Sequence, residues 1–282
     1  MSITVAITRR LSQRSEPALA IAAATVTLTV ITAAELLTTY ANPVSGMALH
    51  ALLLSALIIA GGMGGAGIGD ETPPLSRLLY SLTLVPLIRI LSLSMPLTRF
   101  DQTYWYLMAG LPVLAAILVV TMALGLHFRD IGLCLGRRPF LQLLVIALGF
   151  GLGVMEHFIL NSEPLIDELT LRQFLVPALI LLVATGFLEE LLFRGVLQRT
   201  ALPVLGPVLG LVYVSLIFAI LHIGYRSALD VAFVFAIALI YAWAVRKTGS
   251  ILGVSLSHGL TNIMLFLVAP FIDALSIQGP IG

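Results

Sequence analysis

Residues 173–197 read QFLVPALILLVATGFLEELLFRGVL, an apolar stretch that carries Glu189, Glu190 and Arg194 near its end. An α-helix rises about 1.5 Å per residue, so about 20 apolar residues cross the hydrocarbon core of a bilayer. A charged side chain at that depth costs several kcal/mol and needs a structural or chemical reason. The stretch therefore predicts a transmembrane helix with a polar site inside the membrane.

Similar apolar windows recur along the whole chain. Of the 282 residues, 59% are hydrophobic and 10% are charged, against about 25% charged residues in a soluble domain. We therefore predict an all-α polytopic transmembrane bundle. It should have about nine spans, near Pro17–Leu37, Gly46–Ile68, Leu75–Leu97, Tyr104–Leu126, Phe140–Leu160, Gln173–Leu197, Gly206–Ile223, Ala228–Val245 and Ser250–Phe271.

Charge and cysteine content exclude several classes of protein. The net charge is +1 and there is no basic run, so nucleic-acid binding has no support. The single cysteine, Cys134, excludes a disulfide within the chain and a cysteine-based metal cluster. The first apolar stretch follows three arginines like a signal peptide, but it is long enough to span the membrane, so we expect it to remain as the first helix.

The basic residues predict an orientation. Alternate loops collect 11 of the 15, whereas the opposite loops hold Arg99, Arg172 and Arg226, and Arg89 lies inside a span. By the positive-inside rule, the N-terminus is cytoplasmic and the C-terminus is outside. The 11 residues are Arg9, Arg10, Arg14, Arg77, Arg129, Arg137, Arg138, Arg194, Arg199, Arg246 and Lys247.

The longest basic loop, Arg129–Pro139, suggests a division of the chain. We expect an N-terminal region of four helices at 1–139, which carries no motif of known role, and a second domain at 140–282. The glycine-rich stretch 61–69 lacks the Gly-Lys-Ser/Thr ending of a phosphate-binding loop. We expect it to allow close helix packing instead.

Three polar groups lie in the later spans. Each contains a pair of residues four apart, which share one face of a helix. Glu189 precedes the turn at Pro203–Pro207 by about as many residues as His222 follows it, so the two come level in a helical hairpin. The pairs are Glu190 with Arg194, Phe218 with His222, and His258 with Asn262. One shared polar pocket explains three such groups better than three separate buried contacts do.

Other ionisable residues are scattered through the spans. Glu35 and Glu156 lie near span ends, where interfacial solvation explains them about as well as function does. His157 adjoins Glu156, and Arg89 is expected to pair with a carboxylate elsewhere.

The combination of a carboxylate and two imidazoles suits the activation of water. Glu189 in a dry pocket is a candidate general base. A neutral imidazole of His222 or His258 can share a proton or bind a metal, and the Asn262 amide can donate to an oxyanion. No serine or cysteine lies beside a base in a way that supports a nucleophile. These residues therefore suit hydrolysis of an acyl or amide group.

The three motifs, in this order, resemble the signature of the CPBP intramembrane proteases. That family includes type II CAAX prenyl endopeptidases and bacterial Abi proteins linked to bacteriocin self-immunity. The resemblance covers roughly Gln173 to Pro270. It implies a CPBP-type protease core in a multi-pass protein of the bacterial cytoplasmic membrane, with a membrane-associated peptide or protein tail as substrate.

The resemblance also implies a role for each residue. Glu189 activates water with help from His222, His258 is a third catalytic residue and Asn262 is the oxyanion donor. Glu190 and Arg194 form a structural pair, and Phe218 supports the site. No cofactor is favoured, because a metal-free scheme leaves each residue with one role. The alternative is zinc held by Glu189, His222 and His258.

Two other functions remain open from the sequence. One is a non-catalytic immunity or scaffold protein that has kept the motifs. The other is a transporter that uses the glutamates and histidines as a proton relay, although the paired repeats common in transporters are not visible.

Overall fold

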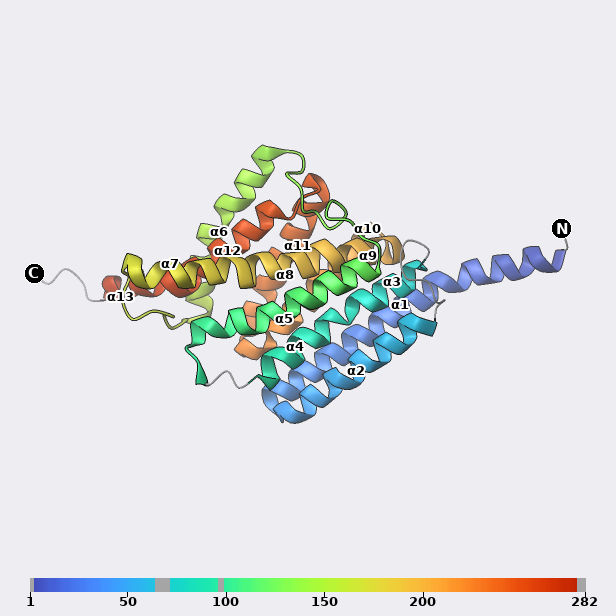
Figure 1. The fold of residues 1–282 in the computed structure, drawn as a ribbon, viewed down its shortest axis with the longest axis horizontal. Helices are drawn as coiled ribbons and strands as arrows, with labels where there is room; N and C mark the ends of the chain where they lie inside the picture. Colours follow the sequence, from blue (N-terminus) through green and yellow to red (C-terminus); the bar gives the residue numbers. More distant parts are fainter. Residues whose placement is uncertain (1–2, 64–71, 96–98, 278–282) are drawn as a thin grey trace, which may run out of the picture.

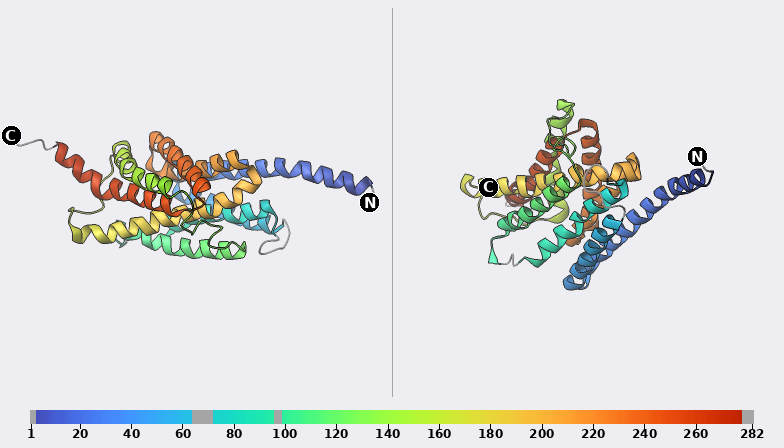
Figure 2. Two further views of the ribbon diagram at one scale, coloured as in Figure 1. Left: turned by 90° about the horizontal axis from the view of Figure 1, so that it is seen from above. Right: turned by 45° about the vertical axis from the view of Figure 1, so that its right-hand side comes forward.

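The computed structural model describes residues 3–63, 72–95 and 99–277. Every regular element in these residues is a helix, and most helices run along the long axis of the molecule (Figure 1). The predicted all-α fold is confirmed. The beginning of α1 and the end of α13 lie at opposite ends of the molecule (Figure 1), and the first turns of α1 extend beyond the bundle in both views of Figure 2.

The N-terminal half forms one side of the bundle. Asn42 turns the chain between its first two helices, because its side-chain Oδ1 accepts hydrogen bonds from the backbone N–H groups of Val44 (2.8 Å) and Ser45 (3.3 Å). The third span is broken at Thr83 into two short helices. The helices are α1 (Ile3–Tyr40), α2 (Pro43–Met63), α3 (Pro74–Leu82), α4 (Leu84–Ser94) and α5 (Gln102–Ala123).

The C-terminal half contains the expected polar motifs. Its sixth span is one long rod in which short π-helical segments alternate with α-helix. The elements are α6 (Pro139–Leu160), α7 (Leu171–Ile180), η2 (Leu181–Phe187), α8 (Leu188–Glu190), η3 (Leu191–Leu197), α9 (Gln198–Leu205), α10 (Pro207–Ile220), η4 (Leu221–Tyr225), α11 (Ala228–Thr248), α12 (Leu252–Ile263), η5 (Met264–Val268) and α13 (Ala269–Ile277).

Within the described residues, nine helices are long and apolar enough to cross a membrane, which confirms the predicted number. Each predicted span overlaps one of them. The sixth is the main difference, because it covers 35 residues, Leu171–Leu205. Arg194 is therefore buried inside a span and is not a loop residue, which corrects its place in the charge count. The predicted spans 46–68 and 75–97 end among residues outside the described ranges.

The surface of the bundle fits a lipid environment. Large apolar side chains project from α5 and α6, and Val119 is 65% exposed. A soluble protein would cover such contiguous apolar surface. The chain is thus a multi-pass membrane protein.

Gly61 supports the expected role of the glycine-rich stretch in packing. A Cβ atom there would lie 3.0 Å from the Tyr80 ring on α3, so the glycine allows α2 and α3 to approach closely. Residues 64–69 of that stretch lie outside the described residues.

The loops that carry the basic residues meet at one end of the bundle. The loop before α6 bonds the loop before α12, where the Arg137 N–H donates to the Thr248 carbonyl at 2.7 Å. Arg199, near the end of the sixth span, lies 3.7 Å from Asp130. At the other end, Arg226 donates to the Thr39 carbonyl at 2.8 Å. Alternate loops therefore share an end, as the basic residues predicted, while the orientation of that end in a membrane stays a prediction.

Helices from both halves contribute to one hydrophobic core. Leu57, Val85 and Ile117 belong to the same buried cluster as Leu192 and Val214. The division at 139/140 stays a prediction, but the first four spans pack directly on the helices that carry the motifs.

Candidate active site

Glu189 lies on the one-turn helix α8, between the π-helical segments η2 and η3. Segments of π-helix are rare and are often found at functional sites, where they redirect a side chain. Glu189 is half-buried and lines a cavity of about 410 Å³, which we call the Glu189 cavity. Its carboxylate makes no hydrogen bond to any described residue. It is therefore free to bind water or a substrate group.

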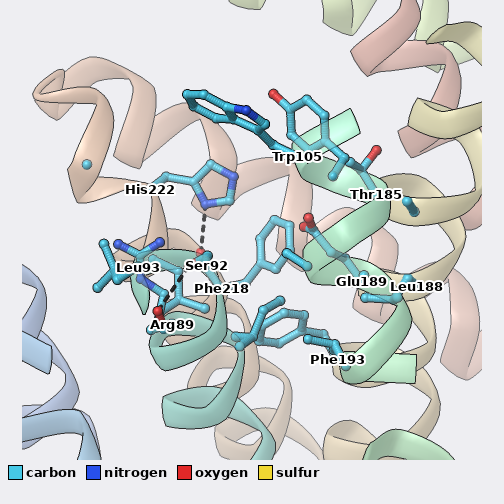
Figure 3. A pocket seen from close by; sticks show the side chains of 18 of the residues that line it. Arg89, Ser92, Leu93, Trp105, Thr185, Leu188, Glu189, Phe193, Phe218 and His222 are labelled. Carbon is cyan, nitrogen blue, oxygen red and sulfur yellow. Dashed lines mark hydrogen bonds between the residues drawn. The ribbon is translucent and has the colours of Figure 1, made fainter. Parts of the chain in front are cut away.

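His222 faces Glu189 from the next span (Figure 3). It lies in the turn η4 that ends α10, and its Nδ1 lies 2.9 Å from the Phe218 carbonyl. A carbonyl only accepts, so Nδ1 carries the proton and a neutral ring presents Nε2 as an acceptor. Glu189 and His222 line the same cavity, as the helical-hairpin argument predicted.

Glu190 points away from that cavity into a buried ionic cluster. Its Oε1 lies 2.8 Å from Arg194 NH1 and 3.0 Å from His258 Nδ1. The side chains of Glu190 and Arg194 are both 0% exposed. The guanidinium lies 4.4 Å from the centre of the Phe218 ring, a cation–π geometry. The expected ion pair is present, and it also holds His258, which the sequence did not indicate.

His258 and Asn262 line a second, smaller space of about 40 Å³, which we call the His258 cavity. That volume holds one or a few water molecules. Since Glu190 accepts from Nδ1 of His258, the ring presents Nε2 on its other side. Asn262 Nδ2 donates to the Thr185 hydroxyl at 2.8 Å, which uses one of its two N–H groups.

Two glycines bring these elements together. A Cβ on Gly186 of η2 would lie 2.5 Å from the Gly259 nitrogen on α12. A Cβ on Gly259 would lie 2.9 Å from Leu182 Cα. Both positions therefore need glycine, because the neighbouring atoms are backbone and cannot move aside. The close approach places the Glu189–Glu190 turn beside the His258 helix.

The structure corrects the expected single pocket. Phe218 and His222 line both cavities, whereas Glu189 lines only the first, and His258 and Asn262 only the second. The physical reason is the Phe218 ring, which packs edge-on against Phe193 at 4.9 Å and against His258 at 5.8 Å and so fills the centre. His222 is the residue that connects the two spaces.

Glu156 is a site residue that sequence reasoning undervalued. It was expected to be explained equally well by interfacial solvation, but it is 7% exposed and lines the His258 cavity with both histidines. The sequence did not indicate that Glu156 is buried, because the residue lies near the end of a predicted span, where the boundary is set only to within several residues. The neighbouring His157 lies 2.9 Å from the Ser162 hydroxyl instead.

Arg89 also lines the Glu189 cavity, on the wall formed by the third and fourth spans. Its guanidinium pairs with Glu35 of α1, and His50 of α2 binds the same carboxylate. Glu35 is 0% exposed, so solvation at the membrane interface does not explain it. The expected carboxylate partner of Arg89 is thus Glu35, 54 residues away. In the sequence, the position of Arg89 inside a predicted span indicated that it has a buried partner, but not that it lines the site.

The expected zinc ligands, Glu189, His222 and His258, do not form a compact metal-binding group. No three His, Cys, Asp or Glu residues in the described ranges converge as a metal-binding group. Both histidines have Nδ1 engaged by an oxygen, as ligand histidines do. Glu189, however, faces a different cavity from His258. As placed here, the three residues do not fit a common zinc ion.

The described structure thus places a glutamate, two histidines and an asparagine in helices that are long and apolar enough to span a membrane, an arrangement expected of an intramembrane hydrolase. Residues 163–264 match the model of the family described as Type II CAAX prenyl endopeptidase Rce1-like. The match covers a little over a third of the chain and includes Glu189, His222, His258 and Asn262. It confirms the recognition of this segment as CPBP-type and, at the level of the family, an endopeptidase of the CAAX type. No curated protein and no solved structure matches the chain.

Proposed function

We propose that the protein is an intramembrane endopeptidase in which Glu189 activates a water molecule. The main support is that Glu189 and His222, from separate spans, line one cavity, and that the Glu189 carboxylate makes no hydrogen bond to any described residue. The substrate is a membrane-associated peptide or protein tail, because the site lies in helices of membrane-spanning length. The matched family supports the peptidase class.

The reaction follows from the positions of the donors and acceptors. Glu189 takes a proton from water as the water oxygen bonds to the carbonyl carbon of the scissile peptide. Nε2 of His222 accepts the second water hydrogen and orients the molecule. The carbonyl oxygen becomes an oxyanion. When that intermediate collapses, the C–N bond breaks and Glu189 returns its proton to the leaving amine nitrogen.

The residues of the His258 cavity are the proposed groups that stabilise the oxyanion. Asn262 retains one unused N–H on Nδ2, and such a donor stabilises a developing oxyanion. His258 is oriented by Glu190, so its Nε2 lies at a set position beside Asn262. The Phe218 ring lies between the two cavities, so the proposal requires this side chain to move when the carbonyl of the bound peptide meets Asn262.

Cleavage by the purified full-length protein tests the proposal. Glu189→Gln keeps the volume and a hydrogen-bonding group but cannot accept the proton, so we expect proteolysis to be abolished while the protein still inserts and folds. Glu163→Gln is the matched control, because Glu163 is exposed in the loop after α6. Full activity in Glu189→Gln would remove the general-base assignment.

The same experiment separates the other two functions. A non-catalytic immunity or scaffold protein would cleave no peptide while keeping its folded state. A proton-coupled transporter would lose substrate flux, not peptide cleavage, in Glu189→Gln. Peptide cleavage that depends on Glu189 would exclude both.

A further inference from the structure

The fifth span carries a carboxyl group that the proposed mechanism does not use. Glu156 of α6 is 7% exposed and lines the His258 cavity together with His258 and Asn262. No described residue makes a hydrogen bond or a close ion pair with its carboxyl group. A buried carboxyl group without a partner is costly, so its presence beside the candidate site needs a physical reason.

A close contact between α6 and α12 places Glu156 at this cavity (Figure 1). Gly149 and Gly153 lie four residues apart on the buried face of α6, and Glu156 continues the same face. A Cβ atom on Gly149 would collide with the Ser257 carbonyl oxygen of α12, and one on Gly153 with the Thr261 carbonyl oxygen. The two backbones therefore meet at these glycines, and the next turn of α6 brings Glu156 to the wall of the cavity.

The His258 cavity is so small that its lining groups act on the same occupant. Its volume of about 40 Å³ holds one or a few water-sized atoms. An oxygen atom in that space that accepts a hydrogen bond from Asn262 therefore lies close to Glu156 as well. Under the proposed function, that atom is the carbonyl oxygen of the scissile peptide, which becomes an oxyanion.

Carboxyl groups outnumber permanent cations around this cavity. Glu156 interacts electrostatically with Asp230 of α11, Glu189 of α8 and His258 of α12. Asp230 is 0% exposed, and neither of its carboxyl oxygens has a hydrogen-bonding partner among the described residues. Among the described residues that line the cavity, none is a lysine or an arginine. The other titratable groups near Glu156 are His222 and Tyr225 of η4 and Tyr241 of α11.

This balance of charge determines which form of Glu156 is compatible with an oxyanion. The buried cation behind His258 is Arg194, and it already pairs with Glu190. An ionised Glu156 would place a second negative charge beside the oxyanion and repel it. A protonated carboxyl group removes that repulsion and supplies an O–H donor, and a neutral carboxylic acid in apolar surroundings is an effective oxyanion donor.

We propose that Glu156 is a further catalytic residue, whose protonated carboxyl group donates a hydrogen bond to the oxyanion beside the Asn262 amide. This role rests on the proposed function and adds to it a second oxyanion donor, from a span outside the three motifs. The proton stays on Glu156 throughout the reaction. Glu189 therefore remains the base that carries the water proton to the leaving amine.

The expected pH dependence has a defined sign. When the pH rises far enough to ionise Glu156, the site loses a donor and gains a repelling charge, so kcat falls. Glutamine keeps an N–H donor and does not ionise. In Glu156→Gln the decline of kcat at high pH should therefore be lost, while the rise from low pH, which belongs to Glu189, remains. A peptide without ionisable side chains keeps the substrate from contributing to the profile.

Substitutions at Glu156 separate a hydrogen-bond donor from packing. Glu156→Leu fills the space without a donor, so kcat should fall on the order of 10²-fold with KM little changed, as for the loss of one oxyanion donor. Glu156→Gln should stay at least about tenfold more active than Glu156→Leu. Glu168→Gln, at an exposed position in the loop before α7, is the control and should keep the wild-type rate and pH profile. Glu156→Gln as inactive as Glu156→Leu would show that the ionised form is needed and would overturn the proposal.

Difference infrared spectroscopy detects the proton without catalysis. The C=O stretch of a protonated carboxyl group should be present in the wild type at neutral pH, absent from Glu156→Gln, and lost with rising pH in step with kcat. An ionised Glu156 across the active pH range would refute its role as a donor. Cleavage by the wild type, with the decline at high pH unchanged in Glu156→Gln, would refute the oxyanion role alone. No cleavage by the wild type would refute the proposed function and the oxyanion role with it.

Discussion

At the scale of single residues, two adjacent glutamates have opposite environments. Glu189 faces a cavity and lacks a hydrogen-bonding partner in the described chain, whereas Glu190 is enclosed by Arg194 and His258. Neighbours on a helix point about 100° apart, so one turn of α8 supplies both a candidate base and a structural anion. The substitutions that separate these roles are therefore one residue apart.

We predict that Glu190→Gln and Arg194→Ala are destabilised in a way that Glu189→Gln is not. Glu190→Gln leaves the buried Arg194 guanidinium without its carboxylate partner, and Arg194→Ala leaves the buried Glu190 carboxylate without its guanidinium partner. Each change lowers the free energy of unfolding by roughly 3–5 kcal/mol. Thermal unfolding of the purified variants in one detergent measures the difference. The double variant Glu190→Gln/Arg194→Met, which leaves no unpaired charge, should recover part of the loss. Variants as stable as the wild type would contradict the structural role of the pair.

We also predict that activity does not need zinc. Glu189 and His258 line different cavities, and no three candidate ligands converge in the described residues. Metal analysis of active protein should find less than one zinc per chain, and chelators should leave the rate unchanged. Stoichiometric zinc, with activity lost to chelation and restored by zinc, would instead recast Glu189 as a ligand.

At the scale of helices, the site depends on the contact between η2 and α12. Gly186 and Gly259 allow the two backbones to meet, and this contact brings the motifs of the sixth and ninth spans together. The third span contributes through α4, which carries Arg89 to the same cavity from the N-terminal half. The third and fourth spans thus form a wall of the site, and the first two spans supply Glu35 and His50 behind it.

Gly186→Ala tests this contact. The added methyl group would lie 2.5 Å from the Gly259 nitrogen and 2.8 Å from the Ser255 carbonyl oxygen, so the helices must separate. We expect a loss of about 1–3 kcal/mol in stability from overpacking and a reduced kcat. Gly151→Ala is the control, because a Cβ there meets no atom within 4 Å. Equal activity and stability in the two variants would show that the close approach is not needed.

At the scale of the whole molecule, the loops rich in basic residues gather at one end. The reassignment of Arg194 to the interior leaves ten basic residues in those loops or in the span ends beside them, against three on the opposite side. The excess still favours a cytoplasmic location for that end. We therefore propose that the N-terminus lies in the cytoplasm, while the location in a bacterial cytoplasmic membrane stays a prediction.

We predict that a reporter fused after Gly282 is active only if it functions outside the cytoplasm. The described residues contain nine candidate spans, an odd number, so the proposed cytoplasmic N-terminus places the C-terminus on the other side of the membrane. A fusion truncated after the eighth span, at Gly249, is the matched control and should report the cytoplasm. A cytoplasmic signal from the full-length fusion would contradict the orientation.

The sequence by itself determined the helices and the chemistry of the motifs. The membrane requires about 20 apolar residues per span, so the number of spans follows from local composition. Pairs four residues apart, such as Glu190 with Arg194, follow from the helical repeat, and the hairpin turn places Glu189 level with His222. These features depend on residues that are close in the sequence or on a short connection.

Only the tertiary structure decided which distant residues meet. The pairing of Arg89 with Glu35, of Glu190 with His258 and of Glu156 with the His258 cavity joins separate spans. Apolar helices can pack in many orders, and lipid-facing and buried faces look alike in an apolar sequence. Packing details such as Gly186 against Gly259 select one order. The division of the site into two cavities follows from the packing of Phe218, which no local pattern specifies.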